Sequence, residues 1–179
     1  MKFKNTLLVL SLLFSFSGFT SDSTHANHGS KSDMKMKMKR KTLDDKTKAQ
    51  VVKALEANEK LHSSFFKYDG KKVELSAREL KMALEKVSDP ELSKLLTFSK
   101  KKLGEIKGTN DRKDNNQSYH LVSMALIHVV NKYDVGKKYN AYSCPMVKKK
   151  WVQNSKTMAK VHNPYAPEMP HCGQQDSHH

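Results

Sequence analysis

The sequence predicts an all-α protein, an antiparallel four-helix bundle with an irregular C-terminal segment that covers it. Between residues 44 and 136, large apolar side chains recur every three or four positions, which is the period of an amphipathic helix. Glycine, proline and aspartate interrupt this pattern at short intervals, so short connections should join the helices, as in an up-and-down bundle. No stretch of useful length alternates apolar and polar residues in the manner of a strand.

The first two helices are placed by their end signals. The first should cover residues 44–67 and end at Gly70, because glycine readily adopts the left-handed conformation that often follows a helix. The second should begin at Ser76, which has the capping-box spacing to Glu79. Its apolar face then continues through residues 80–87.

The third and fourth helices are placed in the same way. Asp89 and Pro90 are the residue types preferred at the N-cap and at the first helical position, so the third helix should begin there. Gly108 should end it. The fourth helix should cover residues 111–134 and end at Gly136, which completes the predicted bundle.

Residues 137–173 form a Cys- and Met-rich segment that we expect to pack on the bundle as a cover. Four of the five prolines lie here, which leaves room for no more than a short helix near residues 150–160. Trp151, the only tryptophan, is the expected apolar anchor of this cover. The last residues, 174–179, are a polar tail.

Residues 1–22 have the pattern of a secretory signal peptide. Lys2 and Lys4 precede an apolar run over residues 7–19, and small polar residues follow it. The run is too short for a membrane span, so we expect no stable membrane anchor. The mature protein should therefore be exported to the periplasm or secreted.

Residues 23–43 should form a flexible arm, because they contain too few large apolar side chains to offset the entropy of ordering. The arm carries thioether and imidazole groups, namely those of His25, His28, Met34, Met36 and Met38. One interpretation is a metal-gathering tail that presents thioethers along an extended chain. The other is a basic linker whose methionines have no role in binding.

The formal net charge of +15 would suit nucleic acid, an anionic membrane surface or an acidic protein as partner. The lysines are spread along every predicted helix rather than gathered with aromatic residues, so we expect a solvated lysine-rich surface and no nucleic-acid binding. The chain also lacks a nucleophile elbow, a zinc-protease motif, a phosphate-binding glycine loop and a Cys-x-x-Cys pair. We therefore expect a binding protein and not an enzyme.

Soft ligand atoms are concentrated in the C-terminal segment. Both cysteines lie there, together with two methionines and a histidine close to them in sequence, and these five residues are Cys144, Met146, Met169, His171 and Cys172. Thiolate and thioether sulfur favour Cu(I). We therefore expect these residues to bind one Cu(I) or Ag(I) ion, with the imidazole as a substitute for one of the sulfur ligands.

Two other interpretations of these residues stay open. An exported protein with two cysteines commonly oxidises them, so Cys144 and Cys172 are also a candidate disulfide, which would leave only methionine and histidine as donors. Alternatively, Met146 and Met169 only fill space under Trp151, and the segment then holds no site.

A second group of donors lies on the fourth predicted helix. His120, Met124 and His128 follow one another at intervals of four residues, so neighbouring members lie one turn apart. His120 and Met124 are therefore secondary metal candidates. The competing interpretation is a stripe of ordinary boundary residues, which is the commoner role of histidine on a helix.

Four short motifs occur in order in the last third of the chain, at residues 142–146, 151–153, 163–165 and 169–173. Together they resemble the family called domain of unknown function 3347, which occurs alone or fused to CusB-type adaptor subunits of heavy-metal efflux pumps. The resemblance implies a helical domain outside the cytoplasm that takes part in copper and silver handling and in heavy-metal resistance. It also implies an efflux adaptor or a cuproprotein as partner.

The sequence therefore predicts an exported, monomeric protein that captures Cu(I) or Ag(I) and hands it to such a partner. The alternative is a metal-free interaction module, in which a disulfide between Cys144 and Cys172 staples a basic helical bundle that docks on an acidic envelope partner. The two predictions differ in the state of the two cysteine sulfurs.

Overall fold

The computed structural model describes residues 39–157 and 160–179, so the predicted signal peptide and nearly all of the predicted arm lie outside the described residues. The elements of the described chain are α1 (Asp45–Ser64), α2 (Gly70–Glu85), α3 (Pro90–Leu95), α4 (Thr97–Glu105), α5 (Arg112–Lys132), β1 (Tyr139–Cys144), β2 (Lys149–Asn154) and β3 (Gln174–Gln175).

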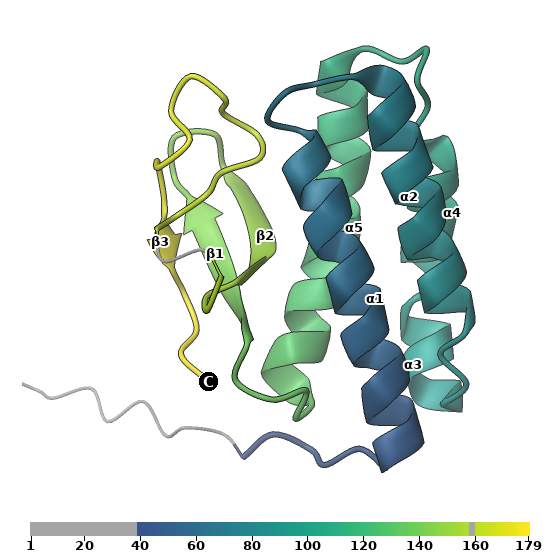
Figure 1. The fold of residues 1–179 in the computed structure, drawn as a ribbon. Coiled ribbons are helices and arrows are strands. Elements are labelled where there is room, and N and C mark those ends of the chain that lie inside the picture. The colour runs from purple at the N-terminus through teal and green to yellow at the C-terminus, as the bar shows by residue number, and fades with distance from the viewer. Residues whose placement is uncertain (1–38, 158–159) are drawn as a thin grey trace, which may run out of the picture. The chain divides into compact units, whose positions relative to one another are not determined.

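The protein is mixed α/β. A three-stranded antiparallel sheet, in the order β2-β1-β3, packs against α5 of the helical part (Figure 1). The all-α prediction is therefore wrong, because the C-terminal segment forms this sheet instead of an irregular cover. The short helix expected near residues 150–160 is also wrong, since β2 occupies the first half of that stretch.

The four longer helices follow the apolar period of the sequence. In the structure α1 packs on α2, α2 on α4 and α4 on α5 (Figure 1). Leucines from each helix meet in the core, and Leu55, Leu80, Leu103 and Leu126 are all buried. Full burial of one such side chain contributes about 1.5–3 kcal/mol.

The start of α2 differs from the prediction. The helix begins at Gly70 and not at Ser76, because Asp69 caps it by accepting hydrogen bonds from the amides of Lys71 and Lys72 at 3.0 and 3.2 Å. A Cβ on Gly70 would lie 2.5 Å from the carbonyl oxygen of Gly108. Glycine is therefore needed for a close backbone approach and not for ending the first helix.

The third predicted helix is divided into α3 and α4. Asp89 and Pro90 act as the predicted N-cap and first residue, and the Asp89 carboxylate accepts from the amide of Leu92 at 2.8 Å. The break lies at Leu96, next to which the Thr97 hydroxyl donates to the carbonyl of Ser93 at 3.1 Å. Such a bond back to the preceding turn often bends a helix.

The sheet was not predictable from alternation, because β1 and the last four residues of β2 are almost entirely buried. All of β1 except Ser143 is buried, and both β1 and β2 pack against α5. Tyr139 and Asn154 both hydrogen-bond to the carboxylate of Glu59 on α1, at 2.5 and 2.9 Å. Side chains alternate along a strand, so Trp151 lies on the face opposite Asn154.

Trp151 is the apolar anchor of the sheet. It is fully buried, and its ring packs on Tyr142 of β1 at 6.0 Å and on Tyr165 at 6.2 Å between ring centres. Its indole N–H donates to Gln153 at 3.2 Å, so the buried polar end of the side chain has a partner.

Residues 39–43, at the end of the predicted arm, lie against the end of α5. The amide of Lys41 donates to the carbonyl of Lys132 at 2.8 Å, and its own carbonyl accepts from the amide of Asp134 at 2.8 Å. The guanidinium of Arg40 also pairs with Asp134 at 3.1 Å. This pairing orders the chain immediately before α1.

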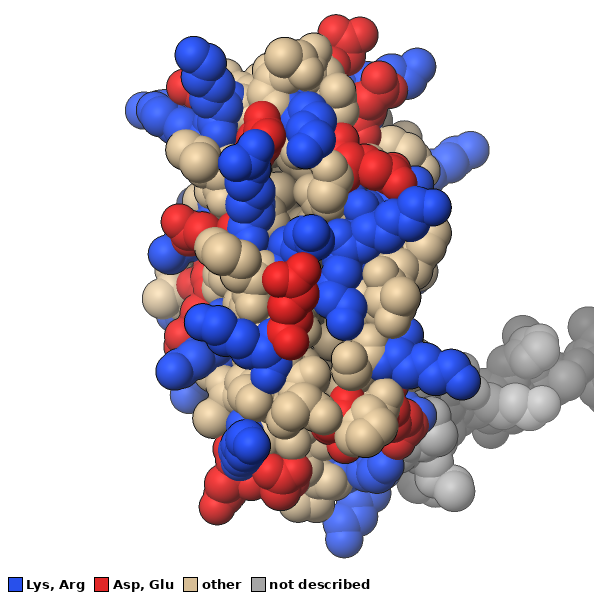
Figure 2. All heavy atoms as spheres, turned by 90° about the vertical axis from the view of Figure 1, so that its right-hand side faces the viewer, with Lys and Arg blue, Asp and Glu red and all other residues tan. Residues whose placement is uncertain are grey.

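Basic side chains are dispersed over the face formed by α2 and α4. Figure 2 shows acidic side chains among them on that face. Arg78 pairs with Glu74 at 2.6 Å and Lys60 with Glu79 at 2.9 Å. Exposed pairs of this kind contribute at most about 1 kcal/mol each. Among the helices described here, none is long and apolar enough to cross a membrane.

Asn115 ties the connection between α4 and α5 together. It is completely buried, its amide donates to the carbonyl of Lys107 at 2.8 Å and to the hydroxyl of Tyr68 at 2.9 Å, and its oxygen accepts from the amide of Lys107 at 3.2 Å. Asn115→Ala should therefore lower the free energy of unfolding by about 2–3 kcal/mol, because it leaves buried groups without partners. Urea unfolding followed by circular dichroism measures this loss.

The matched control is Asn116→Ala at the next position. Within residues 39–157 and 160–179, the side-chain oxygen of Asn116 has no hydrogen-bond partner. Its replacement should cost less than about 1 kcal/mol. Equal losses for the two variants would contradict the role given to Asn115.

Candidate metal centre

The two cysteines meet at one end of the sheet. Cys144 is the last residue of β1, and the chain returns to β1 through β3, which pairs with it in the register Tyr142↔Gln175 and Ser143↔Gln174. This return places the Sγ atoms of Cys144 and Cys172 2.6 Å apart. The pair is thus close enough to form a disulfide or to share one ion.

Gly173 makes this approach possible. Its φ is +141°, and a Cβ there would lie 2.6 Å from the carbonyl oxygen of Ser143 and 2.9 Å from the Trp151 ring. Any other residue would force the chain away from β1 and the tryptophan. Glycine at this position therefore holds Cys172 beside Cys144.

Asn163 fixes the loop that carries Cys172. It is completely buried, its side-chain amide donates to the carbonyl of Cys172 at 3.0 Å, and its oxygen accepts from the amide of Tyr165 at 2.9 Å. Its own amide donates to the carbonyl of Pro170 at 2.7 Å. The Asn-Pro-Tyr motif is thus a structural support for the second cysteine.

The two thiols differ in acidity. Burial raises the pKa of Cys144, but hydrogen bonds with the Cys172 thiol, the amides of Val147 and Met146 and the side chain of Asn163 together lower this pKa below its ordinary value. The hydrogen bond to Cys144 raises the pKa of Cys172, and burial adds to this. Cys144 should therefore lose its proton first.

The other predicted ligands lie in the turns beside the two cysteines. Met146 is 68% exposed and follows Cys144 by two residues, and Met169 is 41% exposed and accepts the amide hydrogen of Cys172 on its carbonyl at 2.9 Å. His171 is exposed, and its Nδ1 lies 2.7 Å from the carbonyl oxygen of Val161, so it must donate there. Neither methionine is buried as a core filler.

The secondary candidates are not gathered with the cysteines. His120 is half-buried on α5, where its Nδ1 accepts from the amide of Lys150 at 3.3 Å, and burial lowers its pKa. Met124 is 43% exposed one turn later, and His128 is exposed as well. His25, His28, Met34, Met36 and Met38 lie outside the described residues.

Two imidazoles outside the predicted ligand set lie close together, and one of them is buried. His62 lies in the last turn of α1, and His162 lies in the loop before Asn163; their ring centres are 5.5 Å apart. The apolar face of the first helix already indicated that His62 points inward. No sequence signal indicated His162, because its contact with α1 joins distant parts of the chain.

In the part of the chain that the structure describes, no three His, Cys, Asp or Glu side chains converge as a metal site. At this end of the sheet the structure brings together the two cysteine sulfurs, and Met146 and Met169 are exposed near them in sequence. No family model, curated protein or solved structure was found to match this chain. The resemblance of its last third to the domain of unknown function 3347 therefore stays a prediction from motifs.

Proposed function

We propose that this protein captures Cu(I) or Ag(I) outside the cytoplasm, through Cys144 and Cys172, and passes the ion to a partner protein. The observation that carries the proposal is the approach of the two thiols to 2.6 Å, with Met146 and Met169 exposed in the adjoining turns. Thiolate and thioether ligands select soft monovalent ions. The four proposed ligand atoms are all sulfur, and harder ions prefer oxygen ligands.

The acidity of the thiols suggests an order of binding. Cys144 supplies the first thiolate, because neighbouring amides stabilise its charge. The ion then displaces the proton of Cys172. Metal–sulfur bonds of about 2.3 Å place two sulfurs up to roughly 4.6 Å apart around one ion. An ion held by both sulfurs would therefore require them to lie further apart than 2.6 Å.

The exposed thioethers suit transfer to a partner. A weak ligand at the surface can leave the ion while a donor of the partner takes its place, so exchange need not pass through a free ion. Met146 and Met169 are the exposed members of the set and would make the first contact. The partner predicted from the family resemblance is an efflux adaptor or a cuproprotein.

The second candidate function is the metal-free interaction module. The approach of Cys144 and Cys172 to 2.6 Å favours it equally, because the same two sulfurs can form a disulfide in an oxidising compartment. Closing the loop between them would stabilise the fold by about 3–4 kcal/mol on the chain-entropy model. The net charge of +15 would then direct the protein to an acidic envelope partner.

Titration of the reduced, exported protein with Cu(I) against a chromophoric chelator tests the proposal. The double variant Cys144→Ser/Cys172→Ser should retain one equivalent of Cu(I) less than the natural protein. Met146→Ala with Met169→Ala should weaken binding of that equivalent by about tenfold or more, as the loss of even outer ligands usually does.

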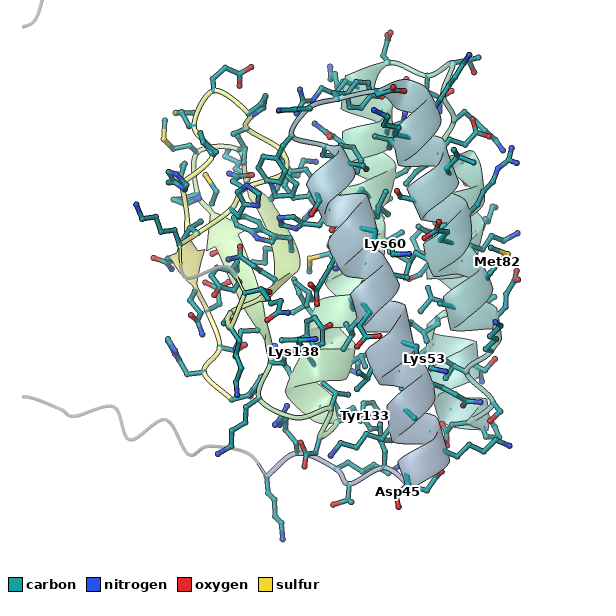
Figure 3. All side chains as sticks on the ribbon, in the orientation of Figure 1. Asp45, Lys53, Lys60, Met82, Tyr133 and Lys138 are labelled. Atoms are coloured by element: carbon teal, nitrogen blue, oxygen red, sulfur yellow. The ribbon has the colours of Figure 1, made fainter. Side chains whose placement is uncertain are left out.

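Met82→Ala is the matched control. Met82 is 55% exposed on α2, on the side of the helices away from the sheet (Figure 3). Its replacement should leave the titration unchanged. The proposal fails if the cysteine variant binds as much Cu(I) as the natural protein. In that case the free thiols of the native exported protein should be counted. If neither cysteine reacts with a thiol reagent before reduction, the protein contains the disulfide of the metal-free interaction module.

A further inference from the structure

A groove runs between α1 and α2 and widens into two hollows. The first hollow lies between the end of α1 and the start of α2, and the second lies between the middle of α1 and the second half of α2. Lys60 of α1 pairs with Glu79 of α2 at 2.9 Å, which joins the two walls of the groove between the hollows. None of the lining residues belongs to the sheet or to the loops that carry the cysteines.

The first hollow is basic. Lys60, Lys67 and Lys72 line it together with three serines and Leu75, and no carboxylate of the described chain is among its lining residues. The ammonium group of Lys72 lies 3.9 Å from the carboxylate of Asp69, which is a long ion pair. Lys67 has no ion-pair partner within the described residues. This end of the groove therefore keeps positive charge that the protein itself does not neutralise.

The second hollow is close to neutral and more apolar. Two lysines and two glutamates share it with Ala57, Met82 and Ala83. Met82 is 55% exposed, and Leu75 in the first hollow is 59% exposed. The two side chains are seven residues apart on α2, so they lie two turns and about 10 Å apart on one face of the helix.

Exposed apolar side chains that gather in one groove commonly mark an interaction surface. Among the described residues, six large apolar side chains are exposed, and two of them, Leu75 and Met82, lie in this groove. Figure 3 shows Lys60 on α1 and Met82 on α2, on helices that do not carry the cysteines. The groove thus offers apolar contacts along its length and positive charge at one end.

We propose that the groove between α1 and α2 binds an acidic amphipathic helix of a partner protein. The apolar side chains of that helix lie on Leu75 and Met82, which have the two-turn spacing of one helical face. Its Asp and Glu residues are grouped at the end that lies in the first hollow, where they meet Lys67 and Lys72. The grouped charge sets the direction of the helix in the groove.

The lining favours a protein partner over other polyanions. Proteins that bind single-stranded nucleic acids use aromatic side chains for stacking, often with arginine, and neither hollow contains an aromatic or arginine side chain among the described residues. A lipid bilayer is flat, whereas Leu75 and Met82 lie in a groove. An amphipathic helix matches both the apolar row and the charge.

This inference goes beyond metal capture and does not depend on it. No lining residue of the groove is part of the cysteine region, so a partner held here leaves Cys144 and Cys172 accessible. The same surface would serve the metal-free interaction module, for which it defines where an acidic partner docks.

Fluorescence anisotropy with a labelled helical peptide and the full exported chain, without copper, tests the groove. The peptide carries leucines on one face and glutamates at one end of that face. Lys67→Glu/Lys72→Glu should weaken binding of this peptide by about tenfold or more, because the reversed charges repel the glutamates. Leu75→Ser should also weaken it, and added salt should weaken binding to the natural protein.

Lys94→Glu/Lys101→Glu is the matched control, because both lysines are exposed outside the groove and the net charge changes equally. This variant should bind the peptide within about twofold of the natural protein. Phe98→Ser, which removes an exposed apolar side chain from α4, is the control for Leu75→Ser and should not weaken binding. Circular dichroism verifies that each variant is folded.

The groove is disproved as a docking site if the natural protein does not bind the peptide at low salt. Equal losses for the two lysine variants would also disprove it, since binding would then follow net charge alone. The partner would be a lipid surface instead if Lys67→Glu/Lys72→Glu abolishes binding to phosphatidylserine vesicles and leaves binding of the peptide unchanged. Failure of the proposed metal site would appear only in the Cu(I) titration.

Discussion

Acidification should destabilise the metal-free protein through His62 by about 2 kcal/mol between about pH 7.5 and pH 5, and by about 4 kcal/mol at about pH 3.5. Burial, and then the neighbouring His162 ring, lower the pKa of His62 from 6.5 to about 3. Between these two values the unfolded chain binds a proton that the folded protein does not. Stability therefore falls as the pH drops below 6.5 and levels off below about 3.

Urea unfolding at a series of pH values measures this effect. His62→Leu removes the titrating group and should abolish the difference between about pH 7.5 and pH 5 apart from a smaller share due to His162, whose pKa is lowered by burial and His171. His128→Leu replaces an exposed histidine on α5 and should behave as the natural protein. If the natural protein and His62→Leu lose the same free energy of unfolding between about pH 7.5 and pH 5, protonation of His62 is not the cause of the loss.

Replacing Trp151 by alanine should lower the free energy of unfolding by about 3–5 kcal/mol. Trp151 is fully buried between Tyr142 and Tyr165, and Gly173 approaches its ring so closely that no other side chain would fit. The variant would leave a cavity where β1, β2 and the returning chain meet. Chemical unfolding followed by circular dichroism measures the loss.

Phe98→Ala is the control for the loss of an aromatic ring. Phe98 is 52% exposed on α4 and lies under the ammonium group of Lys102, 5.4 Å from its ring centre. Its replacement should cost less than about 1 kcal/mol. If Trp151→Ala is no more costly than Phe98→Ala, the tryptophan is not the anchor of the sheet.

The helices were largely predictable because their signals are local. The apolar period located α1 and α5 to within about three residues, and Asp89 and Pro90 marked the start of α3. At Gly70 the local N-cap signal of Asp69 was overlooked, and the close contact of Gly70 with Gly108 comes from another part of the chain. Local end signals cannot distinguish such a glycine from one that ends a helix.

The sheet was missed for a different reason. Strands with one solvated face alternate apolar and polar residues, but β1 and β2 are short and most of their residues are buried, so this alternation is absent. The third strand consists of two glutamines that the sequence places in a polar tail. Only its pairing with Tyr142 and Ser143 makes it a strand.

The sequence by itself determined the helical periods and the chemistry of the donors, because both depend on residue types at short separations. It also identified the cysteines, methionines and Trp151 of the last third as the residues to examine. Only the tertiary structure decided that Cys144 meets Cys172 at 2.6 Å and that His62 lies 5.5 Å from His162. These contacts join residues far apart in the chain, so they exist only after β3 has returned to β1 and the loop around His162 has packed on α1.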